Sequence, residues 1–222
     1  MSKIICANGD SFTSQYYLNP VKNRWTNQVG VTKNLALPGG SNERIFNTTI
    51  HYLNSNIPDI LIIGWTDWGR FMLPSSDGSR FFLTPHYTAL EKTMNEFQSK
   101  LSKDVGEFYY KNLHNSYTNF ENMLNYMLFI HDYCINKRIK LLYFFSTVDE
   151  RWWNERTVQN LSSTKKQQEH LDNLITKIDE KIWIFKKFYS MCEHCKNFKQ
   201  NETLHPMEEG SAHWANLVKQ YL

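Results

Sequence analysis

The sequence lacks several features that would each assign it to a particular class of protein. No apolar run approaches the ~18 residues of a membrane span, and the N-terminus shows no basic region followed by an apolar stretch and a small-residue cleavage site. Four cysteines among 222 residues are too few for a disulfide scaffold. We therefore expect a reduced, cytoplasmic protein with no membrane partner, and a virion-associated protein would have the same composition.

Charge of one sign is also scarce. The formal net charge is +3, and no run of Lys or Arg resembles a stripe that follows a phosphate backbone. No internal repeat or low-complexity tract is evident in the sequence. Nucleic acid is therefore not an expected partner, and a chain of this length fits one domain with a substantial core.

Short apolar segments predict the strands of a sheet. Residues 59–64 and 139–145 are continuous apolar runs, as expected of parallel strands that are covered on both faces. Residues 3–7 form a similar run near the N-terminus, and 33–37 form a weaker one. Residues 182–189 fit either a fifth strand or the continuation of the preceding helix.

Amphipathic segments between these strands predict helices. Apolar residues recur at helical spacing over 41–54 and 171–182. The capping box Thr118-x-x-Glu121 predicts the start of another helix, and Pro206 suits the first turn of the last one. Strands that alternate with helices favour a single domain over 1–222, folded as a three-layer α/β/α sandwich with a central, mostly parallel sheet.

Two long segments do not fit a minimal sandwich. Residues 68–117 are rich in aromatic side chains and then carry an amphipathic pattern from Phe97 to Phe108. Loops of this length are usually functional or disordered. Because the segment leaves the carboxyl end of the third predicted strand, we interpret it as an insertion that walls or caps a site. Residues 147–163 leave the next strand at the same edge.

A serine and a histidine are the candidate catalytic residues. Ser11 ends a Gly9-Asp10-Ser11 turn that leaves the first predicted strand, and ligands bind at the carboxyl ends of strands in open α/β sheets. A serine nucleophile needs a base within hydrogen-bonding reach and a third group that orients the base. Glu202 and His205 supply both if the chain folds back on itself. Asp10 is expected to be a structural hydrogen-bonding residue of the turn.

Two glycine turns lie between these residues in the sequence. Pro38-Gly39-Gly40-Ser41-Asn42 follows the second predicted strand, and Gly64-Trp65-Thr66-Asp67 follows the third. With Gly9-Asp10-Ser11 and Glu202-x-x-His205 they form four blocks, in order, that resemble those of the SGNH (GDSL-type) hydrolase superfamily. The middle blocks are most similar to single-domain members encoded by tailed bacteriophages. The resemblance implies the flavodoxin-like fold of that superfamily.

The resemblance also implies a role for each matched residue. Ser11 would be the nucleophile, His205 the general base, and Glu202 the acid that orients the imidazole. The backbone N–H groups of Ser11 and Gly40, or of Gly39 if the turn is aligned one residue earlier, would line the oxyanion hole, where a fixed donor is worth about 3–4 kcal/mol. Such an enzyme would cleave a carboxylic ester through an acyl-enzyme, and it would require neither a metal nor an organic cofactor.

Two positions depart from the superfamily pattern. Thr66 stands where an asparagine normally donates a side-chain N–H to the oxyanion, and Glu202 stands where the acid is normally aspartate. A threonine hydroxyl donates from a shorter side chain, whereas Ser-His-Glu triads are chemically sound. These departures keep open an alternative in which the fold is retained, catalysis is impaired and the chain binds a glycan or protein partner.

The expected substrate is a small-molecule or glycan ester, and the phage-like blocks favour an O-acyl (O-acetyl) carbohydrate ester. Trp65, Trp68 and Arg70 follow the third predicted strand and are candidate substrate-binding residues. A competing motif is Cys192-Glu193-His194-Cys195, because a CxxC is half of a zinc site or a redox pair. The sequence has no second CxxC. We therefore interpret these cysteines as reduced thiols, and a metal-stabilised interaction module is the second alternative.

Overall fold

The computed structural model describes residues 3–74, 80–83, 96–147, 164–201 and 205–222. Within these residues the main element is a sheet of four parallel strands in the order β2-β1-β3-β6. Its strands are β1 (Ile5–Asn8), β2 (Lys33–Asn34), β3 (Ile60–Trp65) and β6 (Lys140–Phe145). The chain passes from β1 to β2 on one side and then to β3 on the other. Open α/β sheets bind ligands beside such a reversal, which here lies at the carboxyl ends of β1 and β3.

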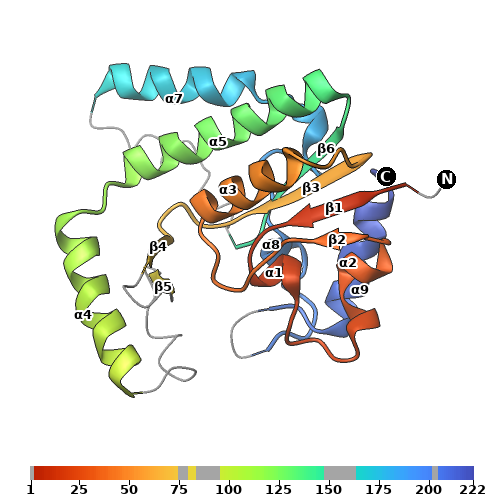
Figure 1. Ribbon diagram of the computed structural model, residues 1–222, viewed down its shortest axis with the longest axis horizontal. Coiled ribbons are helices and arrows are strands. Elements are labelled where there is room, and N and C mark those ends of the chain that lie inside the picture. Colours follow the sequence, from red (N-terminus) through yellow and green to blue (C-terminus); the bar gives the residue numbers. More distant parts are fainter. Residues whose placement is uncertain (1–2, 75–79, 84–95, 148–163, 202–204) are drawn as a thin grey trace.

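Helices cover both faces of the sheet, which confirms the predicted three-layer sandwich (Figure 1). One face is covered by α3 (Asn42–Leu53), α5 (Ser116–Lys137) and α7 (Lys165–Lys177). The other face is covered by α1 (Ser11–Ser14), α2 (Trp25–Gln28), α8 (Met191–His194) and α9 (Glu208–Lys219). Single turns of 3-10 helix are η1 (Val21–Asn23) and η4 (Glu180–Ile182). None of the helices that the structure describes combines the length and the apolarity needed to span a bilayer.

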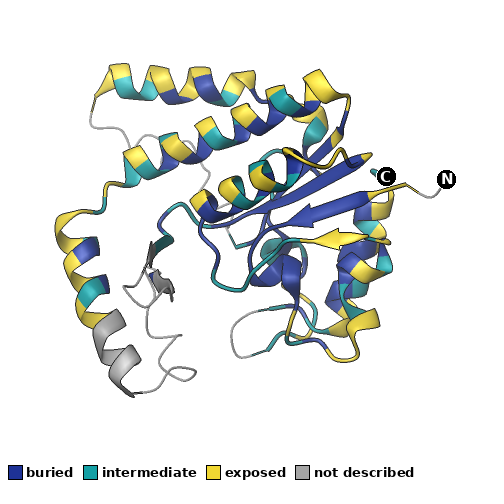
Figure 2. Ribbon diagram, viewed as in Figure 1, coloured by how far each residue is buried: buried dark blue, intermediate teal, exposed yellow. Residues whose placement is uncertain are grey.

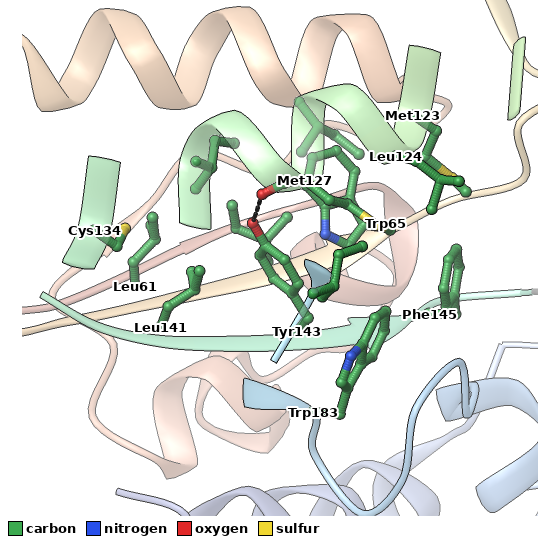
Figure 3. Packing of buried hydrophobic residues seen from close by; sticks show 14 of the residues in the cluster. Leu61, Trp65, Met123, Leu124, Met127, Cys134, Leu141, Tyr143, Phe145 and Trp183 are labelled. Carbon is green, nitrogen blue, oxygen red and sulfur yellow. Dashed lines mark hydrogen bonds between the residues drawn. The ribbon is translucent and has the colours of Figure 1, made fainter. Parts of the chain in front are cut away.

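Two hydrophobic cores form because alternate residues of a strand point to opposite faces of the sheet. Leu61 and Ile63 of β3 pack toward α3, α5 and α7, whereas Ile60 and Ile62 pack toward α1, α2 and α9. The first core also buries the hydroxyl of Tyr143, which donates a hydrogen bond to a carbonyl of α5 at 2.8 Å (Figure 3). Strands β1, β3 and β6 are buried almost throughout, whereas β2 is exposed at the edge (Figure 2).

The segment predicted as an insertion contains an antiparallel hairpin and a long helix. The hairpin consists of β4 (Phe71–Pro74) and β5 (Arg80–Leu83), and the helix is α4 (Glu96–Asn112). Phe71 stacks on Tyr109 with ring centroids 4.7 Å apart, so Tyr109 faces inward. Phe108 is 59% exposed, and the prediction that it belongs to the apolar face is therefore wrong. The Phe97 side chain and residues 148–163 lie outside the described part.

Several predicted element boundaries need correction. Helix α5 begins at Ser116, and its N-cap is Asn115, whose side chain accepts from the Thr118 N–H at 3.0 Å. The predicted capping box at Thr118 is therefore wrong. The helix predicted over 171–182 is α7, which begins earlier, at Lys165, and ends at Lys177 because Ile178 is already extended.

The segment predicted as a fifth strand or a helix is neither of these. After η4, single parallel bridges join Trp183 to Tyr143 and Ser190 to Phe145, so the chain runs irregularly along the outer edge of β6. The last predicted helix is α9, which begins two residues after Pro206. Residues 205–207 thus form the approach to α9, and this approach lies against the segment that follows α1, since the Tyr17 hydroxyl donates to the Pro206 carbonyl at 3.3 Å.

Candidate active site

Ser11 is the first residue of the short helix that follows β1. Asp10 caps this helix, because its Oδ1 atom accepts a hydrogen bond from the Phe12 N–H at 3.0 Å. Ser11 is 7% exposed, and its backbone N–H has no acceptor among the described residues. The turn therefore holds a nearly buried hydroxyl beside an available N–H donor at the carboxyl end of the sheet.

His205 lies within hydrogen-bonding distance of this hydroxyl. Its Nε2 atom is 2.6 Å from Ser11 Oγ, although 194 residues separate the two in the sequence. The backbone of His205 is fixed by Asn201, whose Oδ1 atom accepts from the His205 N–H and whose N–H donates to the His205 carbonyl, both at 3.0 Å. The structure thus brings together the predicted nucleophile and base. Glu202 lies outside the described residues, and its role as the triad acid stays a prediction.

A cluster of polar groups surrounds the Asp10 carboxylate, which is fully buried. Its Oδ2 atom accepts hydrogen bonds from Thr66 Oγ1 and from Arg70 Nη1, each at 2.9 Å, and the second of these is also an ion pair. We call Asp10, Thr66 and Arg70 the Asp10 cluster. The expectation that Asp10 is a structural residue agrees with these contacts. The cluster ties the turn after β1 to the loop after β3 and so fixes the position of Ser11.

The Asp10 cluster changes the interpretation of Thr66. The Thr66 hydroxyl donates its proton to Asp10, and in this conformation it is not available to an oxyanion. The backbone of Thr66 is held by Asn42 at the start of α3, whose Nδ2 donates to the Thr66 carbonyl at 3.0 Å and whose Oδ1 accepts from the Thr66 N–H at 2.9 Å. Sequence reasoning missed this function of Asn42, although Asn42 belongs to the second block.

The turn before α3 contains the two candidate oxyanion glycines, and their backbone N–H groups differ in hydrogen bonding. The Gly40 N–H donates to the Leu37 carbonyl at 3.1 Å, and this hydrogen bond closes the turn. Gly39 adopts a φ of 73°, a conformation that glycine tolerates at no steric cost. The Gly39 N–H has no acceptor among the described residues. Gly40 is therefore engaged within the turn, and Gly39 is the better placed of the two to donate to a ligand.

The predicted substrate-binding residues have different environments. Trp65 is fully buried in the core, where its ring packs edge-on against Tyr143, so the prediction that it lines a pocket is wrong. Trp68 is partly exposed and contacts Phe120 of α5. The Arg70 side chain is 17% exposed, and it forms an ion pair with Asp10, the residue before Ser11. Trp68 and Arg70 therefore stay candidate substrate-binding residues.

Two aromatic rings that the sequence-based prediction missed contact the imidazole of His205. Phe12 stacks on it with ring centroids 4.3 Å apart and an interplanar angle of 28°. Tyr17 contacts it at 4.9 Å with an angle of 55°. Both rings follow Ser11 closely in the sequence, and that proximity to the predicted nucleophile was the available signal.

The CxxC motif lies apart from this site. Cys195 is buried, its thiol donates to the Gly210 carbonyl at 3.4 Å, and burial raises its pKa to about 12. Such a thiol is a poor source of the thiolate that redox exchange requires. Among the described residues, no three His, Cys, Asp or Glu side chains are grouped as metal ligands. His194 of the motif instead stacks on His213 of α9, with centroids 4.8 Å apart.

The fold was compared with those of known proteins. No family model and no curated protein matches the sequence. Among solved structures, the psychrotrophic esterase EstA from Pseudoalteromonas sp. is 9% identical, with a TM-score of 0.54 over 99% of this chain and 96% of that chain. TesA is also 9% identical, with a TM-score of 0.52 over 99% and 98%.

A third structure gives the same result. It is described as a lipolytic protein of the G-D-S-L family from Desulfitobacterium hafniense DCB-2, it is 10% identical, and its TM-score is 0.51 over the whole of both chains. At such low identities the likeness establishes the fold. The chain thus has the α/β/α fold of GDSL-type esterases, as the four sequence blocks predicted.

Proposed function

We propose that this protein is a serine-dependent carboxylic ester hydrolase. The observation that carries the proposal is the 2.6 Å contact between Ser11 Oγ and His205 Nε2. A nucleophile and a base in direct contact at the carboxyl edge of a parallel sheet form the arrangement that acyl transfer needs. The fold shared with esterases supports the proposal, and so does the description of EstA as inhibited by monoethylphosphonate.

The reaction would proceed through two acyl transfers. Ser11 Oγ attacks the ester carbonyl carbon while His205 Nε2 takes the hydroxyl proton. The tetrahedral intermediate then collapses, the C–O bond to the alcohol breaks, and His205 returns the proton to the departing alcohol. Water, deprotonated by His205, attacks the resulting acyl-enzyme, the bond between the acyl carbon and Ser11 Oγ breaks, and His205 returns the proton to Oγ as the acid leaves. Each cycle consumes one ester and one water and regenerates the Ser11 hydroxyl.

The proposed oxyanion hole uses backbone donors. The N–H groups of Ser11, at the start of α1, and of Gly39, in the turn before α3, have no acceptor among the described residues. Fixed donors of this kind stabilise the charge that develops on the carbonyl oxygen. Glu202 would orient the imidazole through Nδ1. Trp68 and Arg70 would contact the substrate, for which we propose an O-acyl group on a carbohydrate.

Covalent labelling tests the proposal. A fluorophosphonate probe should label the purified protein at Ser11, and the Ser11→Ala and His205→Ala variants should lose at least about 1,000-fold in labelling rate, because nucleophile and base act as a unit. Ser14→Ala is the matched control, since Ser14 lies on the same short helix and is equally buried. A folded protein that is not labelled would refute the hydrolase. The rates with a p-nitrophenyl ester series from acetate to decanoate would then show which acyl chain lengths the pocket accepts.

A binding protein with impaired catalysis is the second candidate. It is favoured by one observation, namely that the Thr66 hydroxyl and the Gly40 N–H are both engaged within the protein. Under this alternative the probe leaves Ser11 unmodified, while the folded chain retains a glycan or a protein partner. The same labelling experiment therefore separates the two functions.

A further inference from the structure

Ser11 belongs to a segment that also contacts the proposed base through two aromatic rings. Phe12 is next to Ser11 in α1, and its ring is 2% exposed and stacks on one face of the His205 imidazole. Tyr17 comes six residues after Ser11, and its ring contacts the same imidazole at 4.9 Å. One stretch of seven residues therefore carries the nucleophile and both rings that touch the base.

The path of this segment is fixed by buried polar contacts. Gln15 ends α1 in a left-handed conformation with a φ of 43°, which turns the chain so that Tyr17 lies beside His205. The Gln15 side chain is fully buried, and its Oε1 atom accepts hydrogen bonds from the Trp25 N–H at 2.6 Å and from Ser211 Oγ at 2.9 Å. The Tyr17 hydroxyl donates to the carbonyl of Pro206, the residue after the base. The two rings are thus held in place independently of the imidazole.

We propose that Phe12 and Tyr17 form an aromatic slot that positions the His205 imidazole and stabilises its protonated form. This inference rests on the proposed function, because it assigns positioning residues to the same base. An imidazolium forms when His205 takes the Ser11 proton, and the π faces of aromatic rings attract cations. The slot would therefore lower the energy of the transition state and raise the affinity of His205 for a proton.

Other titratable groups lie near the slot, and their charges must be the same in the variants that are compared. The Tyr17 hydroxyl is itself titratable, and its pKa is raised, first by burial and to a lesser degree by Asp10 and Cys195. Arg70 pairs with Asp10, and Glu202 precedes the base by three residues in the sequence. A test must therefore change the ring without changing these charges. Tyr17→Phe keeps the ring, whereas Tyr17→Leu fills similar space without a π face, and both remove the hydroxyl.

Kinetics as a function of pH provide the first test. Compared with Tyr17→Phe, the Tyr17→Leu enzyme should show a kcat about threefold lower with KM unchanged, and the acidic limb of its kcat/KM profile should lie about half a pH unit lower. Tyr16→Leu is the matched control, because Tyr16 is 59% exposed and contacts Tyr17 rather than His205. Identical profiles and rates for the Phe and Leu variants would overturn the slot. Tyr17→Met serves the same comparison if Tyr17→Leu does not fold.

A titration by NMR gives a result that does not need activity. The pKa of the His205 ring would be measured in the Ser11→Ala background, with Phe or Leu at position 17 and the His205 resonance assigned from a His205→Gln sample. A lower pKa with Leu supports the slot even if the protein hydrolyses no ester. Equal pKa values in an enzyme that is labelled at Ser11 refute the slot and leave the hydrolase intact.

Discussion

Ser11 follows Asp10, whose carboxylate is paired inside the protein, whereas His205 contacts two aromatic rings. The turn is held by the Asp10 carboxylate, which receives directional hydrogen bonds from a backbone N–H, a hydroxyl and a guanidinium. The imidazole contacts two rings at 4.3 and 4.9 Å and Ser11 Oγ at 2.6 Å, and the His205 backbone N–H donates to Asn201. The described surroundings of the proposed nucleophile are therefore mainly polar, and those of the proposed base include two aromatic rings.

This difference predicts how each end of the site responds to change. A buried polar cluster loses much of its stabilisation when one member is removed, because the remaining groups are left unpaired without water. A ring contact is less directional, so its removal should cause a smaller loss of stability. Mutations near the nucleophile should therefore affect stability and activity together, and mutations near the base should affect mainly the rate.

The largest effect is expected from Asp10→Ala. The change leaves the Phe12 N–H, Thr66 Oγ1 and Arg70 Nη1 without their acceptor, and removal of one partner from a buried ion pair is strongly destabilising. We expect a loss of about 3 kcal/mol in the free energy of unfolding, measured by urea denaturation, together with much slower labelling of Ser11.

Asp67→Ala is the control for this variant. Asp67 also accepts a hydrogen bond from a backbone N–H in the same loop, that of Gly69 at 2.6 Å, but it lies outside the Asp10 cluster. The Asp67→Ala change should lower the free energy of unfolding by only about 1 kcal/mol. Equal losses of unfolding free energy in Asp10→Ala and Asp67→Ala would show that the Asp10 cluster contributes no more than a single hydrogen bond. They would contradict the proposed difference between the two ends of the site.

The next effect in size is the dependence of the rate on pH. Only neutral imidazole accepts the Ser11 proton, so the rate should rise with pH through the titration of a histidine, by roughly tenfold or more between pH 5 and 7.5. Hydrolysis of a p-nitrophenyl ester across a buffer series measures it, with far-UV circular dichroism at each pH to confirm that the chain is folded. A rate that is flat from about pH 5 to 9 would argue against His205 as the base.

A smaller effect is expected from Asn201→Ala. The variant removes the acceptor of the His205 N–H, so we expect a cost of about 1 kcal/mol in stability and a fall of a few-fold in kcat, because the rings still enclose the imidazole. Asn201→Asp keeps an acceptor at the same position and should retain most of the rate. If the Ala variant lost as much activity as Asp10→Ala, the base would be no less dependent on polar contacts than the nucleophile.

Much of the fold could be predicted from the sequence because its signals are local. The buried strands β3 and β6 are continuous apolar runs, and Ser41 caps α3 at the position where the predicted helix begins. The predictions that were wrong concern positions where nearby residues compete for the same structural role. Asn115 caps α5 in place of Thr118, and Tyr109 takes the inward position expected for Phe108.

The candidate site was predictable only in its outline. Ser11 and His205 were found because each belongs to a recognisable block of residues, and the structure brings them together. The pairing of Asp10 with Arg70 joins positions 60 residues apart and depends on side-chain conformation, which no local pattern encodes. For the same reason, the engagement of the Thr66 hydroxyl by Asp10 could not be anticipated from the block that contains Thr66.

The separation of 194 residues between Ser11 and His205 has a consequence for the timing of synthesis. Ribosomes add roughly 5–20 residues per second, so the nucleophile precedes its base by about 10–40 s at that rate. Ser11 cannot be activated by His205 during this interval. In the proposed hydrolase, the nascent chain would therefore pass most of its synthesis without the catalytic pair, which is complete only after His205, just before α9, has been added.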